Sequence, residues 1–238
     1  MSIWERLSAA TRNLSVGGKI SSLLGFGSTS QAREVDSEPD NEVPFTVGVI
    51  VLSAKMAKAD GTVDADEVKA FKEAFKLSAA EMKQAAPIFN SAKRDATNFE
   101  TCAEQLVTVF NGNRKVLEDV LDGLFHIAKA DEEVRQQEEQ FLEKVAKRFG
   151  FTVGEFNAIK ARHLDKGNPY DVLGVKPSIS DEELECYYRM LVADDDARGV
   201  PKEFAIIAIE KRASLKEAYD KIIKERSKSG YVTTPMSA

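Results

Sequence analysis

A repeated segment constrains the fold of this chain of 238 residues more than any other feature. The run Ala-Lys-Ala-Asp-Gly-Thr-Val at 57–63 returns as Ala-Lys-Ala-Asp-Glu-Glu-Val at 128–134, so that Asp60 corresponds to Asp131. In each copy an apolar helical pattern ends at the Asp, and a second helical pattern begins shortly after the Val. Two such units related by a pseudo-twofold axis would bury both apolar helices against each other.

Apolar residues spaced three and four positions apart predict that residues 44–164 are helical throughout. Val68, Phe71 and Phe75 follow this spacing, which is typical of a half-buried helix. It recurs in Leu117, Val120, Leu121, Leu124, Ile127 and Ala128, and again in Phe141, Val145, Ala146 and Phe149. Gly150 then stands where a helix end is expected. No alternating strand pattern competes with these runs, so we expect an all-α domain.

The first 43 residues form an N-terminal segment and a linker. Residues 1–25 carry the apolar Trp4, Leu7, Leu14, Ile20, Leu23 and Leu24 among polar and basic residues. This pattern fits a peripheral contact with a membrane surface or a segment that packs on its own domain. The polar, acidic stretch that follows has no periodicity and is expected to be a disordered linker. The apolar run at 44–52 is shorter than the roughly 20 residues of a membrane span, and we expect it to begin a buried helix.

Composition excludes several classes of protein. A formal net charge of −6 and a pI near 5.2 argue against a nucleic-acid binder, which normally presents a basic face. The two cysteines, Cys102 and Cys186, have no metal-ligand or redox spacing, which indicates a reduced, cytoplasmic protein. No signal-peptide pattern stands at the N-terminus. We therefore expect a cytoplasmic protein with no transmembrane segment, with peripheral contact at the inner membrane through residues 1–25 as the alternative.

The C-terminal part predicts a short helix followed by a helical hairpin. The short helix spans 169–173, and the hairpin helices span about 180–192 and 202–227. Ser180 and Glu183 have the spacing of a capping box at the start of the first hairpin helix. The third helix has an apolar face made by Phe204, Ile207, Ala208, Leu215, Ala218, Tyr219, Ile222 and Ile223. Residues 228–238 are expected to be a mobile tail.

These two parts resemble two known modules. The Ala-Asp…Val…Glu repeat with its helices resembles the TerB-like family, an all-α domain associated with tellurite resistance. The runs Asn-Pro-Tyr-Asp-Val-Leu-Gly-Val at 168–175 and Ser-Asp-Glu-Glu-Leu at 180–184 resemble a J domain, by which DnaJ-type co-chaperones act on DnaK-type chaperones. DjlA-like proteins carry both modules in this order. The resemblance implies a TerB-like domain at 44–164, a J-like domain at 165–227 and a non-enzymatic co-chaperone or adaptor.

The J-like part departs from the family in its loop and in its charge. The family carries a His-Pro-Asp tripeptide between its second and third helices, whereas no histidine follows His163 here, and the stretch 192–201 looks shortened. The family's second helix is basic, but residues 180–196 hold seven acidic side chains against Arg189 alone, a net charge of −6. We therefore expect a degenerate J domain that does not stimulate a DnaK-type ATPase.

A degenerate J-like hairpin can still serve as a packing or protein-binding element. The candidate residues for contact with a protein partner, a DnaK-type chaperone included, are Tyr187, Tyr188, Arg189 and Arg198. A decayed homologue without remaining activity is the alternative, and a single sequence does not separate decay from a new use.

The repeat also supplies a candidate site for a divalent cation, calcium or magnesium. TerB-like domains are associated with metal binding at acidic positions, and the resemblance carries this role onto Asp60, Glu67, Asp131 and Glu138. Helix capping is the alternative, because Asp64 and Glu67 form a capping box. Arg135 occupies the equivalent cap position in the second copy. If metal is bound, the chain is a metal-responsive stress protein with the J-like part as a structural cap.

Nothing in the sequence indicates covalent or acid–base catalysis. The two histidines, His126 and His163, have no Cys or second His at ligand spacing, and His126 fits a half-buried structural role. Phosphate-binding glycine loops do not stand out. We expect that the protein is not an enzyme.

Overall fold

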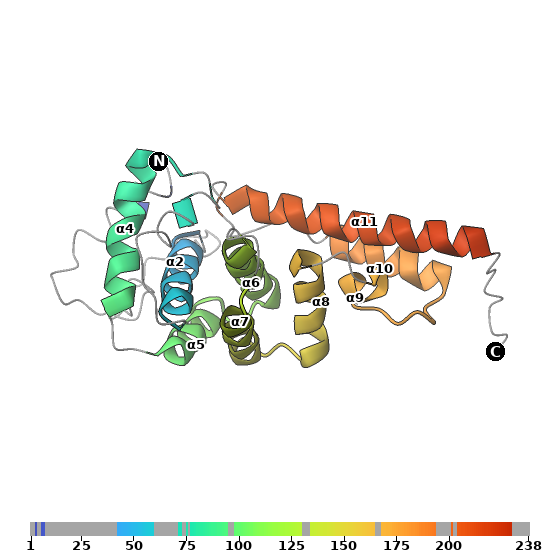
Figure 1. The fold of residues 1–238 in the computed structure, drawn as a ribbon, viewed down its shortest axis with the longest axis horizontal. Coiled ribbons are helices and arrows are strands. Elements are labelled where there is room, and N and C mark those ends of the chain that lie inside the picture. The colour runs from blue at the N-terminus through green and yellow to red at the C-terminus, as the bar shows by residue number, and fades with distance from the viewer. Residues whose placement is uncertain are drawn as a thin grey trace, which may run out of the picture.

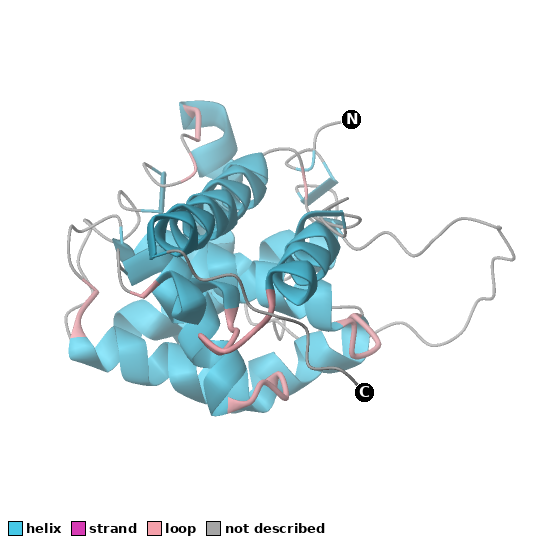
Figure 2. Ribbon diagram, turned by 90° about the vertical axis from the view of Figure 1, so that its right-hand side faces the viewer, coloured by secondary structure: helices cyan, strands magenta, loops and turns pink. Residues whose placement is uncertain are grey.

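The computed structural model describes residues 3, 6–7, 42–59, 71–72, 75, 77–94, 98–129, 134–164, 168–193, 201 and 204–229. Within these ranges the regular secondary structure is helical and contains no strand, as the end-on view in Figure 2 shows. The predicted all-α fold is therefore confirmed for the described part of the chain.

The described helices form an elongated molecule with α11 along one side (Figure 1). Helices α2, α4 and α5 occupy one end, α6, α7 and α8 the middle, and α9 and α10 the other end. Their bounds are α2 Glu42–Ala59, α4 Ala79–Arg94, α5 Phe99–Val109, α6 Arg114–Ala128, α7 Gln136–Arg148, α8 Val153–Leu164, α9 Pro169–Leu173, α10 Asp181–Ala193 and α11 Ala205–Ser229.

Helix α2 is the centre of the larger core. It contacts α4, α5, α6 and α7, and its side chains from Phe45 to Met56 are buried. Two polar side chains on this helix return their hydrogen bonds to its own backbone, with Thr46 Oγ1 donating to the Glu42 carbonyl at 2.9 Å. Ser53 Oγ donates to the Val49 carbonyl at 2.6 Å. These local hydrogen bonds allow the two hydroxyls to be buried without a loss of hydrogen bonding. The apolar run is buried from Phe45 onward, as the sequence predicted.

The helices before the repeated Asp pack against each other. These are α2 and α6, and their contact places the two apolar runs of the sequence repeat side by side in one core. The close approach of α2 to α5 depends on Gly48, since a Cβ there would lie only 2.7 Å from the Leu106 side chain. The segments that contain Asp60, Glu67 and Asp131 lie outside the described residues.

Local signals set several helix ends where the sequence predicted them. The capping box at the start of α10 is present, with Ser180 N–H donating to Glu183 Oε2 at 3.1 Å and Glu183 N–H donating to Ser180 Oγ at 3.2 Å. Gly150 follows α7 with φ of 83°, and Gly174 ends α9 with φ of 69°. Both are in the left-handed region that favours glycine.

Helix α11 belongs to two cores. Its second half joins α9 and α10 in a smaller core made by Val172, Leu173, Leu184, Leu215, Ala218 and Ile222. Phe204, which precedes the helix, and Ile207 in its first turn lie in the larger core instead. The Phe204 ring packs 5.5 Å from that of Phe45 and 4.6 Å from that of Phe75, measured between centroids. Both residues are buried, as expected for the apolar face of this helix, but the bundle covers them, because the helix continues past the hairpin onto the bundle.

The described part of the N-terminal segment packs on the bundle. Ile3 and Leu7 are buried in the larger core, and Arg6 Nη1 lies 2.5 Å from Glu42 Oε2. For these residues the structure agrees with the alternative in which the segment covers its own domain. Across the described ranges, no helix combines the length and the apolar character that a bilayer crossing requires. Of the expected linker and mobile tail, residues 42–43 belong to α2 and residues 228–229 to α11; the remainder of both, and the rest of residues 1–25, lie outside the described residues.

Candidate functional site

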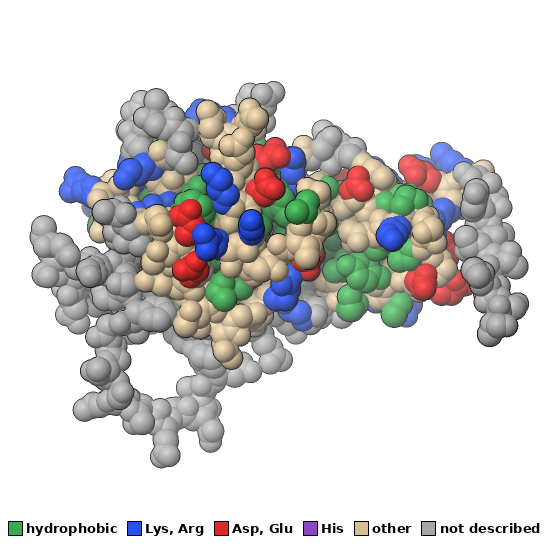
Figure 3. Space-filling model, turned by 90° about the horizontal axis from the view of Figure 1, so that it is seen from below, with side chains coloured by type: hydrophobic (Ala, Val, Ile, Leu, Met, Phe, Trp, Pro, Cys, Tyr) green, Lys and Arg blue, Asp and Glu red, His purple; other side chains and the backbone are tan. Residues whose placement is uncertain are grey.

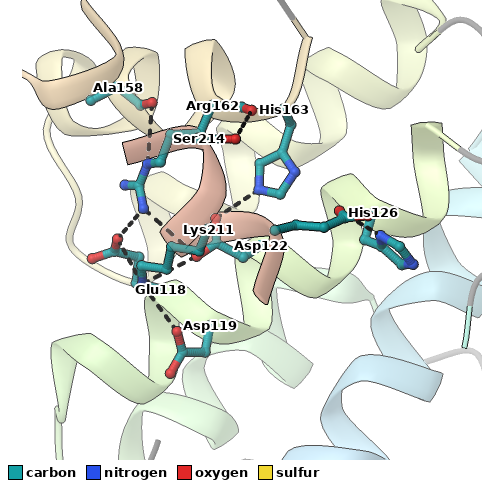
Figure 4. A network of polar contacts seen from close by, with 10 residues as sticks. Glu118, Asp119, Asp122, His126, Ala158, Arg162, His163, Lys211 and Ser214 are labelled. Atoms are coloured by element: carbon teal, nitrogen blue, oxygen red, sulfur yellow. Dashed lines mark hydrogen bonds and ion pairs between the residues drawn. The ribbon is translucent and has the colours of Figure 1, made fainter. Parts of the chain in front are cut away.

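The structure places a buried carboxylate, Asp122, where α6 meets α8 and α11 (Figure 4). The side chain of Asp122 has no exposed surface. Its Oδ1 lies 2.7 Å from Nε2 of His163, and its Oδ2 lies 3.3 Å from Nζ of Lys211. Arg162 Nη1 stands 3.8 Å from the same Oδ2. The charge that Asp122 would carry is thus matched by side chains from two other helices.

Two further carboxylates of α6 join this arrangement, and we call the six side chains the charge cluster: Glu118, Asp119, Asp122, Arg162, His163 and Lys211. Lys211 Nζ lies 3.1 Å from both Glu118 Oε1 and Asp119 Oδ1, and Arg162 Nη1 lies 2.7 Å from Glu118 Oε1. The carboxylates follow the helical spacing of one face of α6. That face therefore holds α8 through Arg162 and α11 through Lys211.

Burial and charge act in opposite directions on the carboxylates. Burial raises the pKa of Asp119 to about 6, with Lys211 opposing the shift and Asp122 and Glu118 adding to it. Burial alone would also raise the pKa of Asp122, but Lys211, Arg162 and the His163 hydrogen bond hold it well below its usual value. The same three carboxylates raise the pKa of Lys211 against the effect of its own burial. Asp122 is therefore ionised near neutral pH, and Asp119 is the carboxylate that changes its charge there.

Both histidines take structural positions at this junction. His163 is buried and stacks on the Phe125 ring, with centroids 5.2 Å apart and planes 4° from parallel. His126 is half-buried, as the sequence predicted, and its Nδ1 lies 2.9 Å from Oε2 of Glu210 on α11. The hydrogen bond to His126 lowers the pKa of Glu210, followed in size by the opposing effect of burial. This pair is a second polar contact between α6 and α11.

The described residues that the sequence predicted as partner contacts lie in different environments in the hairpin. Tyr187 borders a cavity of about 190 Å³ that it shares with Leu191 and with residues of α6 and α8. Tyr188 stacks on Tyr219 of α11, with centroids 4.3 Å apart. Arg189 points outward with 76% of its side chain exposed and pairs with Glu185. Arg198 lies outside the described residues.

The same end of the molecule carries apolar surface. Met190 on α10 is 53% exposed, and Figure 3 shows hydrophobic side chains gathered on the lobe of α9 and α10 with charged side chains around them. A larger cavity of about 550 Å³ lies between α8 and α9, bordered by Ala158, Ala161, Leu164, Tyr170 and Gly174. This lobe therefore offers both a hollow and an exposed apolar side chain.

The acidic repeat is represented in the structure by Glu138 alone. Glu138 Oε2 accepts a hydrogen bond from Arg135 N–H at 2.8 Å, at the start of α7. Its described contact is that of a helix cap. Within the described ranges no group of three or more His, Cys, Asp or Glu side chains is placed to hold a metal ion. The role of Asp60, Glu67 and Asp131 stays a prediction.

Comparison with known proteins finds a family match for the helical bundle and relatives along most of the chain. Residues 46–161 match the family profile of the tellurite resistance protein TerB, so the helical bundle is a TerB-like domain. The chain is 27% identical to co-chaperone protein DjlA of Photobacterium profundum, over 93% of this chain and 89% of that protein. It is 25% identical to the DjlA of Coxiella burnetii (85% of this chain, 84% of that protein) and 24% identical to the DjlA of Vibrio cholerae (90% and 87%).

Over most of its length the chain is thus similar to proteins named co-chaperone DjlA, and its residues 46–161 match the TerB family. The resemblance noted in the sequence is confirmed at the level of the TerB-like domain and the family. No solved structure matches the chain significantly.

We predict that Lys211→Met strongly destabilises the protein. It leaves Asp122 and its neighbours with Arg162 as their one remaining permanent cation, and breaking a buried pair costs about 3–5 kcal/mol. Lys216→Met is the matched control, because Lys216 is 67% exposed and pairs with Asp220 on the same helix. Its cost should be within about 0.5 kcal/mol. Equal losses in the free energy of unfolding, measured by denaturant titration, would contradict the importance of the charge cluster.

We also predict that EDTA leaves the melting temperature unchanged, because the described contact of Glu138 is a cap and not a ligand. Thermal melting with EDTA, with calcium and with magnesium measures this directly. Calcium- or magnesium-dependent stabilisation that disappears in the double variant Asp60→Asn with Asp131→Asn would show instead that the repeat binds metal.

Proposed function

We propose that the protein is a non-enzymatic, DnaJ-like co-chaperone that acts by contact with another protein. The observation that carries this proposal is similarity to proteins named co-chaperone DjlA over 80–93% of the chain, which includes both the bundle and the hairpin. Helices α9, α10 and α11 present the hairpin at one end of the molecule, where a partner can reach it (Figure 1). Cys102 is buried and Cys186 is exposed, and the two are not joined in a disulfide, which fits the reduced, cytoplasmic location that we propose.

We further propose that the hairpin does not stimulate the ATPase of a DnaK-type chaperone in the usual way. The sequence has no histidine after His163, so it cannot supply the His-Pro-Asp tripeptide of the family. The exposed face of α10 also carries a negative charge, which is the wrong sign of charge for binding the family's partner. Glu182, Glu183 and Glu185 on this helix are exposed, where the family's second helix is basic. Like charges brought together across an interface cost several kcal/mol.

The same charges indicate which partner surface the hairpin would accept. An exposed acidic helix with Met190 on its surface favours a partner that presents basic and apolar side chains. Tyr187, Tyr188, Arg189 and Arg198 are the residues that we propose for this contact. We favour this adaptor role over a metal-responsive one, because the relatives are named for a co-chaperone function and Glu138 caps a helix.

We predict that the protein leaves single-turnover ATP hydrolysis by the host's DnaK-type chaperone unchanged. A DnaJ-type protein with an intact tripeptide is the positive control, and a peptide client measures the effect of substrate alone. The variant Glu182→Lys with Glu185→Lys separates charge from the tripeptide, and we expect no acceleration from it either. Acceleration by the unaltered chain beyond the effect of the peptide would overturn the proposal of a degenerate J domain. It would leave the co-chaperone role itself intact.

A further inference from the structure

The charge cluster holds more carboxylates than permanent cations. Glu118, Asp119 and Asp122 stand against Lys211 and Arg162, and the exposed fractions of these five side chains run from 0% to 24%. With all three carboxylates ionised, the carboxylates outnumber the permanent cations Lys211 and Arg162 by one. A buried charge without a partner is costly, so the cluster gains stability by taking up one proton.

Asp119 is the side chain best placed to take that proton near neutral pH. It is mostly buried, with 14% of its side chain exposed, and burial raises its pKa to about 6. The charged groups around it are Glu118 and Asp122 on its own helix, Lys211 on α11, and Arg162 and His163 on α8. The His126–Glu210 pair lies further along the same contact of α6 with α11.

The cluster sits where α11 passes from one core to the other. Lys211 lies between Ile207, which packs in the bundle, and Leu215, which packs in the hairpin. One turn after Lys211, Ser214 Oγ donates a hydrogen bond to the Arg162 carbonyl at 3.0 Å. Since α11 packs closely along α9, a change in how α11 sits on α6 and α8 is carried to the hairpin.

We propose that the charge cluster is a proton-linked latch. With one proton bound it seats α11 on the bundle, and loss of that proton loosens α11 and the hairpin together. The proton moves to solvent from a carboxyl oxygen of Asp119, while Asp122 stays ionised. This inference concerns the orientation of the hairpin and does not depend on which partner the hairpin contacts.

The direction of the pH effect follows from the two shifted carboxyl groups. The pKa of Asp119 in the seated form is about 6, above its ordinary value near 3.8, so its contribution is complete only below 3.8 and is lost as the pH rises from there to just above 6. The pKa of Asp122 is shifted down, so its contribution is lost only in strong acid. Between about pH 5 and pH 8 the protonation of Asp119 therefore sets the equilibrium between the seated and loosened forms, and α11 loosens as the pH rises. Over this window the equilibrium between seated and loosened forms should change by about tenfold.

The distance between hairpin and bundle tests this proposal. Cys186 on α10 is exposed and Cys102 is buried, so a spin label at Cys186 and a second at Lys144→Cys on α7 report on the two lobes. We expect a narrow distance distribution at about pH 5.5 and a broader one at about pH 8. Asp119→Asn keeps the side chain at this position uncharged and should give the narrow distance distribution at both pH values.

Asp220→Asn is the matched control, because Asp220 is 57% exposed on α11 and its replacement should leave the response to pH as in the unaltered chain. Thermal melting provides a second measurement. The melting temperature should fall between about pH 5.5 and pH 8 in the unaltered chain and less so in Asp119→Asn. Identical distance distributions at both pH values in the unaltered chain would overturn the proposal. So would an undiminished response in Asp119→Asn.

Discussion

A buried carboxylate at the middle of α6 sets the arrangement of the helices around it. Asp122 has no exposed surface, and an ionised carboxylate in that position must be matched by cations and hydrogen bonds. The cations come from α8 and α11, with Lys211 standing 92 residues after Asp119. Removing one partner of such a pair is more costly than the pair is worth in stability. The ion pairs therefore fix the orientation of α8 and α11 on α6, as well as how closely these helices pack.

The residue after Asp122 allows this close approach. A Cβ at Gly123 would lie 3.0 Å from Cδ1 of Ile207, so the absence of a side chain there lets α11 come down onto α6. Polar and apolar contacts thus act together: the charge cluster sets the orientation of α11, and Phe204 and Ile207 anchor its first turns in the bundle. Because the hairpin packs on the other end of α11, the orientation of α11 also sets that of the hairpin. A protein built this way presents its hairpin from the TerB-like domain in an orientation that depends on the charge cluster.

Features that depend on neighbours in sequence were predictable, and those that depend on distant residues were not. The bounds of α9 and α10, the capping box of Ser180 and Glu183 and the helix end at Gly150 all follow from local backbone chemistry. Helical spacing placed Phe204 and Ile207 on the apolar face of their helix but did not predict that the bundle covers them, because spacing shows which residues share a face and not what packs on it. The charge cluster was missed for the same reason. Its one signal was the spacing of Glu118, Asp119 and Asp122, which puts three carboxylates on one face of a helix that is otherwise largely apolar.

Native-state hydrogen exchange tests most directly the claim that one helix ties the two lobes together. At about pH 5.5, where the latch is closed, the amides of α9 and of α11 between Leu215 and Ile222 should open with the same free energy as those of α2 and α6. That result is expected if the lobes unfold as one unit. Exchange of the hairpin through a separate opening of lower free energy, with the bundle still protected, would contradict the account.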